Sequence, residues 1–599
     1  MLWLKEDTYF AQADSGSFLL SYDALLRLDE TVPRDVIDSV MPALKQGRSF
    51  QEASAQLPPE QRTVARDLLG ILQDLGLMVA TAEPAPLPEG QVGDQSFVIT
   101  GDGGFSTDFA AALQQCGLDV RVVETATGRP IEMLTLADGD NKLLCHVAAN
   151  DDGVCWSFVD LREQTPVASP LAAFRRGASF AATTAPSDGL GTQIRRKTIT
   201  AIAAKQIARQ ILRPSWARPP AGVVTFLDGR TLQTSTHHVT VHPYGVPAKQ
   251  RTQDQFRRDQ TELHNGPPLS RPALTEGWQR LSDERFGAFA CLEDTKLRQL
   301  PLKVVLARMS DPCRLLSAPP AVVGVGLDRE SARERAIVQA LAAYGSIVVD
   351  PRLLVDKNGA FLGPRTGNAA RLLGPVRDGS VDTFVRAIDL TDGRERLLPA
   401  EQAFPVLRTP EPSHAPCGTS AALDWRQALT VGLLQHCVRL TVSGSSFPAR
   451  EHPALAVADF DQDPSVWFLA TMAKAAGIDC TLHDITGPAG IPVVACVSTS
   501  EQTVYGGGVH LIEAVREALL AALFRYQLRS DPVLNTAMST APPAIWTNPA
   551  SSASTSPDRL VNALTSLGYT PSVFALDHDR LVHETVPYVL RVVLEQVVT

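Results

Sequence analysis

The sequence predicts a multidomain α/β protein, in the broad sense that includes α+β modules. Its 599 residues correspond to roughly three or four domains of about 150 residues each. A proline-rich stretch at residues 83–96 and a polar stretch at residues 246–266 interrupt the chain as linkers do. Between these breaks, strand-like and helix-like patterns alternate. We therefore expect three modules, over residues 1–82, 97–245 and 267–599.

Composition restricts the classes of function. The net charge is -10 and no block of lysine and arginine occurs, so we expect no nucleic-acid partner, because phosphate contact needs a concentrated basic face. No stretch of about 18 uncharged apolar residues is present and Glu6 and Asp7 follow the start closely, so we expect no membrane span, no secretory signal and a cytoplasmic protein. The nine cysteines are scattered without a CxxC motif, which predicts reduced thiols and no structural metal.

The first module has the pattern of a small winged-helix domain. Residues 8–13 and 17–21 predict a hairpin around a turn at residues 14–16. Helical patterns follow at residues 23–28, 33–44 and 61–75, the last with apolar residues at helical spacing and Gly76 as its stop. Up to Ala80 the chain has seven Lys and Arg against twelve Asp and Glu, which is the wrong sign for a DNA-binding winged helix.

This arrangement resembles the PqqD-like peptide-recognition domain of enzymes that modify ribosomal peptides. In that family a leader peptide adds a strand beside the third strand and packs on the third helix, a case of β-augmentation. The candidate peptide-binding residues are an apolar groove with two nearby arginines for acidic leader residues: Phe18, Leu19, Leu20, Val64 and Leu68, with Arg62 and Arg66. The alternative is that the apolar members are simply core.

The second module begins as a βαβ unit. Residues 96–100 predict a buried strand, 101–104 a tight turn, 108–116 a helix and 120–124 a second strand. The glycines resemble a dinucleotide fingerprint, but Ser106 occupies the position of its last glycine, so a nicotinamide oxidoreductase is only weakly indicated.

With the patterns at residues 155–160, 195–212, 222–228 and 242–245, this module resembles a shortened ThiF-like (ubiquitin-activating-like) domain of azoline-forming peptide cyclases. Members of that family often hold zinc through paired cysteines. No cysteine lies between Cys155 and Cys291, so zinc is not expected, and His237, His238 and His242 are predicted to be surface or core residues.

Residues 267–599 resemble a YcaO domain. The likeness lies in residues 281–287, in 323–326 before a first helix, in Gly418 and 425–432 before a second helix, and in 484–486 with 490–492. With the two upstream modules, it implies a relative of the cyclodehydratases of thiazole/oxazole-modified ribosomal peptides. In that family, ATP and Mg²⁺ activate the amide oxygen after a Cys, Ser or Thr side chain has attacked the carbonyl.

The carboxylates that this chemistry implies are missing. Magnesium takes oxygen ligands, and a triphosphate needs metal ions held by carboxylates. The family pattern places Glu at five positions on three helices and Gln at a sixth, and this chain replaces all of them, with Gln339, Ala342, Gln435, Val438, Ala521 and Phe524. We name these the six ligand positions.

Few nearby groups offer compensation for this loss. Glu334 is predicted to face away from Gln339, whereas Glu517 lies one turn before Ala521 on the same face and is the one acid expected to reach a metal. Arg439 and Arg525 are candidates for residual anion affinity.

No other catalytic motif replaces the missing site. Walker A, G-x-S-x-G and H-E-x-x-H motifs do not occur. His436 and Cys437 are adjacent, but neighbours on a helix point about 100° apart, so a Cys-His dyad needs a partner from elsewhere in the fold.

The sequence therefore favours a noncatalytic protein, for which we expect no cofactor. It would bind the leader of a ribosomal precursor peptide as a scaffold or regulatory subunit, in a homo- or hetero-oligomer with a separate active YcaO cyclase or a flavin dehydrogenase. The alternative is an ATP- and Mg-dependent cyclodehydratase that forms thiazoline or oxazoline through relocated ligands.

Overall fold

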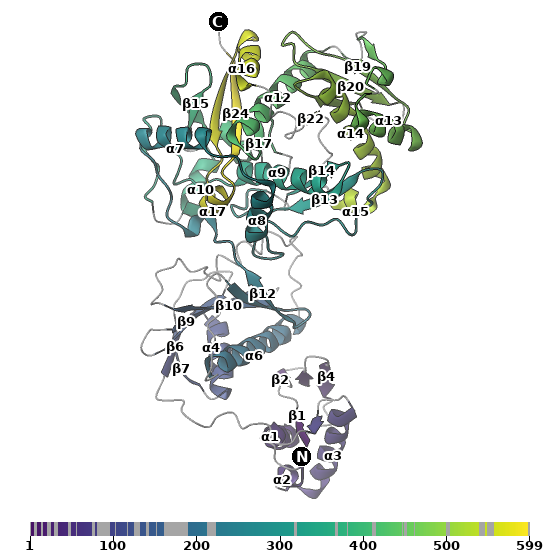
Figure 1. Ribbon diagram of the computed structural model, residues 1–599. Coiled ribbons are helices and arrows are strands. Elements are labelled where there is room, and N and C mark those ends of the chain that lie inside the picture. Colours follow the sequence, from purple (N-terminus) through teal and green to yellow (C-terminus); the bar gives the residue numbers. More distant parts are fainter. Residues whose placement is uncertain are drawn as a thin grey trace. The chain divides into compact units, whose positions relative to one another are not determined.

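A computed structural model gives the fold of the chain (Figure 1). The structure describes residues 2–4, 9–13, 16–20, 25–28, 34–45, 50–55, 57–74, 78–80, 96–101, 103–116, 118–124, 132–138, 143–150, 153–160, 190–212, 223–316, 320–365, 369–379, 381–409, 415–445, 447, 452–460, 462–498, 503–537, 545–547 and 556–596. The chain divides into two compact units, one formed mainly by residues up to 237 and one mainly by residues 238–599. Among the described helices, none combines the length and the apolar character needed to cross a membrane.

The N-terminal residues form two small antiparallel sheets and three helices. Strands β2 (Tyr9–Ala13), β3 (Gly16–Leu20) and β4 (Leu25–Leu28) form a sheet in that order, and β1 (Leu2–Leu4) pairs with β5 (Met78–Ala80). The helices are α1 (Arg34–Lys45), α2 (Phe50–Ser54) and α3 (Pro59–Asp74). The predicted hairpin is confirmed.

The helix predicted at residues 23–28 is wrong, because β4 occupies residues 25–28. β4 pairs antiparallel with β3, with Leu19 opposite Leu26 and Leu20 opposite Leu25. A six-residue segment closes barely one helical turn, so cross-strand pairing decides its conformation.

The rest of the first unit is a seven-stranded sheet with two helices. Its strands are β6 (Ser96–Gly101), β7 (Asp119–Glu124), β8 (Glu132–Asp138), β9 (Leu143–Asn150), β10 (Gly153–Asp160), β11 (Val223–Asp228) and β12 (Thr234–His238), in the order β12-β11-β10-β9-β8-β6-β7. Helices α4 (Gly103–Gln115) and α6 (Leu190–Leu212) pack together in one apolar core with the sheet (Figure 1).

Only the start of this sheet follows the predicted βαβ pattern. β6 and β7 are parallel across α4, but β6, β8, β9, β10 and β11 are joined by antiparallel pairs. The tight turn predicted at residues 101–104 is instead the beginning of α4 at Gly103.

The second unit begins earlier than the predicted module boundary at residue 245, since the chain enters it at His238. The predicted linker at residues 246–266 contains a helix, α7 (Gln253–Asn265). Thr252 caps α7 through a reciprocal capping box with Gln255. Thus much of the supposed linker belongs to the packed unit.

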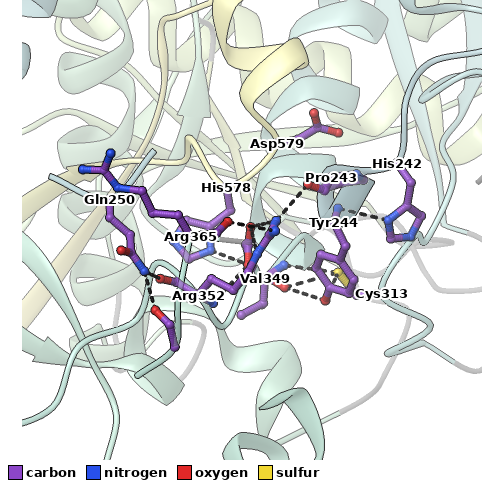
Figure 2. Close-up of polar contacts among 12 residues, drawn as sticks. His242, Pro243, Tyr244, Gln250, Cys313, Val349, Arg352, Arg365, His578 and Asp579 are labelled. Carbon is purple, nitrogen blue, oxygen red and sulfur yellow. Dashed lines mark hydrogen bonds and ion pairs between the residues drawn. The ribbon is translucent and has the colours of Figure 1, made fainter. Parts of the chain in front are cut away.

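The segment before α7 is anchored by hydrogen bonds to buried groups (Figure 2). The Tyr244 hydroxyl donates to the Val349 carbonyl at 2.7 Å. The guanidinium of Arg352, only 2% exposed, forms an ion pair with Asp350 at 2.7 Å and donates to the Pro243 carbonyl at 3.2 Å. These contacts join residues 243–244 to residues 349–352 of the second unit.

Three sheets organise the second unit: β13-β14, β16-β15-β23-β24-β17 and β18-β19-β20-β21-β22. The strands are β13 (Lys303–Arg308), β14 (Ala321–Gly326), β15 (Phe384–Asp389), β16 (Glu395–Pro399), β17 (Thr419–Ala421), β18 (Ala454–Leu455), β19 (Cys480–Asp484), β20 (Val493–Ser498), β21 (Val504–Gly507), β22 (Ile545–Thr547), β23 (Tyr569–Ala575) and β24 (Val589–Gln596).

The long helices α9 (Arg329–Ile347), α12 (Trp425–Gly444) and α14 (Leu511–Ser530) follow β14, β17 and β21. The remaining helices are α8 (Arg271–Leu281), α10 (Ala369–Arg377), α11 (Ala400–Ala403), α13 (Pro464–Ala475), α15 (Pro532–Ala537), α16 (Pro557–Ser566) and α17 (Arg580–Thr585). Separate apolar clusters form around α9, α12 and α14, so each long helix is the centre of its own core.

Candidate functional site

Helices α9, α12 and α14 carry the six ligand positions, two on each helix. Asp328 caps α9 by accepting the Ser331 N–H at 2.8 Å, and Asp424 caps α12 by accepting the Gln427 N–H at 2.7 Å. These caps satisfy backbone donors that would otherwise lack partners at the helix starts. The starts of α9 and α12 are therefore fixed by side-chain caps.

Four of the six ligand positions lie in apolar cores. Ala342 is buried in the cluster around α9, and Val438 is buried in the cluster around α12. Ala521 and Phe524 are buried together in the cluster around α14. Val438 packs so closely on β21 that a Cβ added to Gly507 would lie 2.1 Å from its Cγ2 atom. No oxygen atom is available from these side chains.

The two glutamines differ from each other. The Gln435 side-chain oxygen accepts the Gly418 N–H at 2.8 Å, and its side-chain nitrogen donates to the Thr419 carbonyl at 3.2 Å. The Gln435 amide is therefore used to fasten α12 to the start of β17. Gln339 is half-buried on α9.

Glu517, the acid expected to reach a metal, is instead held by an arginine of α9. Its carboxylate accepts two hydrogen bonds from the Arg335 guanidinium, at 2.8 Å and 3.2 Å, and Glu517 is only 1% exposed. A bidentate pair of this kind is short and directional. Glu334 faces away from the ligand positions, as predicted, and pairs with Arg271 at 2.9 Å.

These residues do not fit a magnesium nucleotide. A hard cation needs several oxygen ligands, and a triphosphate needs compensating metal charge. The six ligand positions supply apolar side chains and two amides, of which one is committed to the backbone, and the neighbouring carboxylate is neutralised by Arg335. In the part of the chain described, no group of three or more His, Cys, Asp or Glu is arranged to hold a metal ion.

The two arginines expected to attract anions lie in different surroundings. Arg525 on α14 is half-buried, and burial lowers the pKa of its guanidinium. Arg439 on α12 is exposed and borders a cavity of about 500 Å³ beside β24. None of the six ligand positions lines this cavity or the two smaller ones described.

His436 has a cysteine neighbour, although not the adjacent one. Its Nδ1 atom lies 3.7 Å from the sulfur of Cys417, while its Nε2 atom lies 2.9 Å from the Val592 carbonyl oxygen. Cys437 points into the core, where burial raises the pKa of its thiol to about 12. Sequence spacing could not reveal this contact between Cys417 and His436, because it depends on the pairing of β17 with β24.

The peptide-binding residues predicted in the N-terminal module divide between core and surface. Leu68 is 1% exposed within the core of α1 and α3, so it packs inside and does not line a groove. Val64 is half-buried and Arg66 is exposed. The Arg62 guanidinium donates to the carbonyls of Leu57 and Ala55 at 2.9 and 3.0 Å, which closes the turn between α2 and α3.

The prediction that a leader peptide adds a strand beside residues 18–20 is wrong, because these residues belong to β3, the central strand of its sheet. Residues Phe18, Leu19 and Leu20 pair with β2 on one side and with β4 on the other. Their backbone groups are therefore already used, and the edges of this sheet are β2 and β4.

The three histidines discussed for zinc are surface or core residues, as predicted. His237 is buried, with Nε2 2.7 Å from the Ser235 hydroxyl, and His238 is exposed. His242 is buried, with Nε2 2.9 Å from the Pro312 carbonyl oxygen, and its Nδ1 accepts the Tyr244 N–H at 3.1 Å (Figure 2).

The second unit is an α/β domain in which each of the three long helices follows a strand. The family model described as YcaO cyclodehydratase, ATP- and Mg²⁺-binding, matches residues 273–594. This match covers more than half of the chain, and the chain therefore belongs to the YcaO cyclodehydratase family.

Solved structures resemble the chain at low sequence identity. A heterocyclase in complex with substrate and cofactor is 15% identical, with 99% of this chain and 94% of that chain covered and a TM-score of 0.48. The heterocyclase TruD is also 15% identical, with the same coverage and a TM-score of 0.45. YcaO from Methanopyrus kandleri bound with AMPPCP and Mg²⁺ is 18% identical, with 54% and 89% covered and a TM-score of 0.38. No curated relative matches the sequence.

Proposed function

We propose that this chain is a noncatalytic scaffold or regulatory subunit in the biosynthesis of an azol(in)e-containing ribosomal peptide. It would bind the leader of the precursor peptide and act beside a separate active YcaO cyclase or a flavin dehydrogenase. The observation that carries this proposal is the state of the six ligand positions. Apolar packing of Ala342, Val438, Ala521 and Phe524 keeps the family fold without its ligands, since folding needs packing and not metal binding.

The competing function is an ATP-dependent cyclodehydratase with relocated ligands. It is favoured by the family description, which names ATP and Mg²⁺. The two functions differ in one measurable property, the affinity of the intact chain for a magnesium nucleotide.

Calorimetric titration with Mg-ATP separates the two functions. The scaffold predicts no saturable heat up to millimolar nucleotide, with or without precursor peptide. A matched titration of the Glu517→Gln variant checks the buried acid one turn before Ala521. Micromolar binding by the wild-type chain, with phosphate release when peptide is added, refutes the scaffold.

Leader binding is proposed for residues 1–82, with residues 97–245 as a ThiF-like bridge to the YcaO domain. Because β3 is paired on both sides, the added strand would lie along the edge strand β4 (Leu25–Leu28). Exposed Arg66 on α3 remains a candidate for contact with acidic leader residues.

Two proline variants test the β4 edge. On an antiparallel strand, the N–H groups of consecutive residues point to opposite sides, so one of Leu26 and Arg27 donates toward β3 and the other outward. The probe is the labelled leader of the precursor peptide encoded beside this gene. We expect one of the variants Leu26→Pro and Arg27→Pro to keep the wild-type unfolding midpoint and to bind this probe more than tenfold more weakly. Undiminished binding by that variant removes β4 as the site.

A further inference from the structure

The cavity beside β24 has the features of a binding site that is separate from the six ligand positions. Its volume is about 500 Å³. Its lining includes Gln402, Cys417, His436, Arg439 and Arg591, together with residues 592–596 of β24. α12 packs along β24 here (Figure 1). His436 and Arg439 of α12 line the cavity beside the strand.

In the part of the chain that the structure describes, one edge of β24 has no partner strand along the cavity. β17 pairs with β24 only at Val589, Leu590 and Arg591. At the next residue, the Val592 N–H donates to the Gly418 carbonyl at 2.8 Å and the Val592 carbonyl accepts from His436. Among the described residues, no strand continues this pairing beyond Val592.

The backbone groups that face this open edge follow from strand geometry. Successive residues of a strand direct their N–H and C=O groups to alternate sides. Since the groups of Val592 point toward β17, those of Leu594 and Gln596 point the same way, while Val593 and Glu595 face β23. The cavity wall therefore offers an edge to which an extended chain can add.

The close fit at the end of β17 depends on glycine. Gly418 has a φ of +90°, and an added Cβ would lie 2.2 Å from the Val592 carbonyl oxygen and 2.3 Å from His436 Nε2. Only a residue without a side chain allows this approach. β17 thus ends at the cavity, after the contact between Gly418 and Val592, and no described strand pairs with the rest of this β24 edge.

The charge of the cavity is positive. Arg591 is 7% exposed; one of its Nη atoms donates to the Thr419 hydroxyl at 3.1 Å, and its Nε atom has no hydrogen-bond partner among the described residues. Burial lowers the pKa of Arg591 to about 10, so it stays charged at neutral pH. Exposed Arg439 adds a second cation, and the lining acid Glu595 is paired with Arg396 at 2.7 Å.

We propose that this cavity binds an extended acidic peptide segment, which adds a strand beside residues 592–596 of β24 and places a carboxylate against Arg591 and Arg439. The open backbone edge favours a peptide over a small anion, because phosphate would satisfy the arginines and leave the edge unpaired. This second peptide site is independent of the leader site proposed on β4, and failure of either leaves the other standing.

Cys417 provides a local reporter of occupancy. It lines the cavity, and burial raises the pKa of its thiol. The Val592 carbonyl can only accept, so His436 Nε2 carries the proton and Nδ1 is the acceptor beside the Cys417 sulfur. The thiol is thus a slowly reacting neutral group inside the site, and a bound peptide should shield it further. Cys291, which is exposed, serves as an internal control.

Fluorescence polarisation of the full chain tests the proposal. The probe is a labelled hexapeptide that alternates valine and glutamate, with valine–glutamine and valine–lysine versions as controls. We expect saturable binding of the glutamate probe, at least tenfold weaker binding of both controls, and a tenfold loss in Arg591→Met and Arg439→Met. Arg426→Met, an exposed change on the same helix, should leave binding unchanged.

Alkylation by iodoacetamide, followed by mass spectrometry, locates the bound probe. The glutamate probe should slow modification of Cys417 and not of Cys291. Equal binding of the glutamate and glutamine probes, full affinity in Arg591→Met, or unchanged Cys417 alkylation overturns the proposal. Displacement of the probe by millimolar inorganic phosphate, with equal protection of Cys417 by phosphate alone, identifies a small-anion site and overturns the peptide assignment.

Discussion

At the scale of single residues, the polar groups nearest the six ligand positions are bound by other groups of the chain. Glu517 lies almost fully buried against Arg335, and Gln435 uses both ends of its amide on the backbone of residues 418 and 419. The sequence showed that carboxylates were missing, but it could not show what Glu517 contacts. Arg335 lies on α9, four residues before Gln339, whereas Glu517 lies on α14. Only the packing of α9 and α14 brings the two side chains together.

Removal of one member of the Arg335–Glu517 pair should be costly. Arg335→Met leaves a buried carboxylate without its partner, and such changes cost about 3–5 kcal/mol of unfolding free energy. The double variant Arg335→Met/Glu517→Met should recover most of the loss, because neither charge remains. Chemical denaturation of the second unit measures both, and a single variant as stable as wild type contradicts the buried pairing.

Restoring a family carboxylate should destabilise the protein and not repair it. Val438→Glu puts a carboxylate in an apolar cluster against Gly507, and we expect a loss of more than about 2 kcal/mol together with a raised pKa of the new group. Ser443→Glu, an exposed change on the same helix, is the control. Thermal unfolding with and without Mg-ATP measures the effect; wild-type stability with gained nucleotide binding contradicts the packing described.

His436 should make the second unit sensitive to mild acid. Burial lowers its pKa from 6.5 to about 4, so below pH 6.5 the unfolded chain takes up a proton that the folded chain refuses. Stability is fully present above pH 6.5 and falls by about 3 kcal/mol as the pH drops to 4. His578 and His583, whose pKa values burial also lowers, add to the slope. In His436→Gln, denaturation between pH 7 and 4 should show a shallower loss, and an unchanged slope contradicts this assignment.

At the scale of elements, the long periodic segments were predictable and the short ones were not. Helices α1 and α3 agree with the predicted segments within a few residues at their ends, whereas α4 and α6 start five residues earlier than predicted. α12 begins at Trp425, so residues 425–432, which were predicted to precede the second helix, are part of it. β4 was predicted as a helix because four residues are too few for the spacing of its leucines to distinguish a helix from a strand. Its conformation is set by pairing with β3. α7 was predicted as a linker because its sequence is mostly polar. Only Phe256 and Gln260 of this helix are buried, so it shows no apolar periodicity.

The capping box of α7 gives a test of that helix. Thr252→Ala removes the side chain that accepts the Gln255 N–H, and such a loss costs about 1 kcal/mol. Hydrogen exchange of residues 253–265 should become faster. Thr261→Ala, which alters an exposed hydroxyl bonded to the Arg257 carbonyl, should change exchange much less. Equal effects of the two variants would show that the cap does not stabilise α7.

At the scale of the whole molecule, the α/β class and the family could be predicted, whereas the boundary near residue 245 could not. Boundary prediction relied on composition, and residues 243–250 are held by contacts with Val349, Arg352 and Gly363, about a hundred positions further along the chain. The cavity beside β24 was equally hidden, because it combines residues from α11, α12 and β24 that share no sequence motif.

The unfolding midpoint of the whole chain, measured with and without a ligand, reports binding. A ligand at a hundred times its Kd raises the unfolding free energy by about 2.7 kcal/mol. We expect no shift of the unfolding midpoint with Mg-ATP, and a shift that depends on Arg591 with the valine–glutamate probe. A nucleotide-dependent rise in the wild-type midpoint contradicts the first expectation.

The ion pair between Arg335 and Glu517 also bears on how this protein behaves in a living cell. Since the countercharge of Glu517 is covalently part of the chain, helices α9 and α14 stay joined without help from any diffusible species. We therefore expect starvation, a falling adenylate pool or magnesium depletion to leave its shape and its resistance to proteases unaltered.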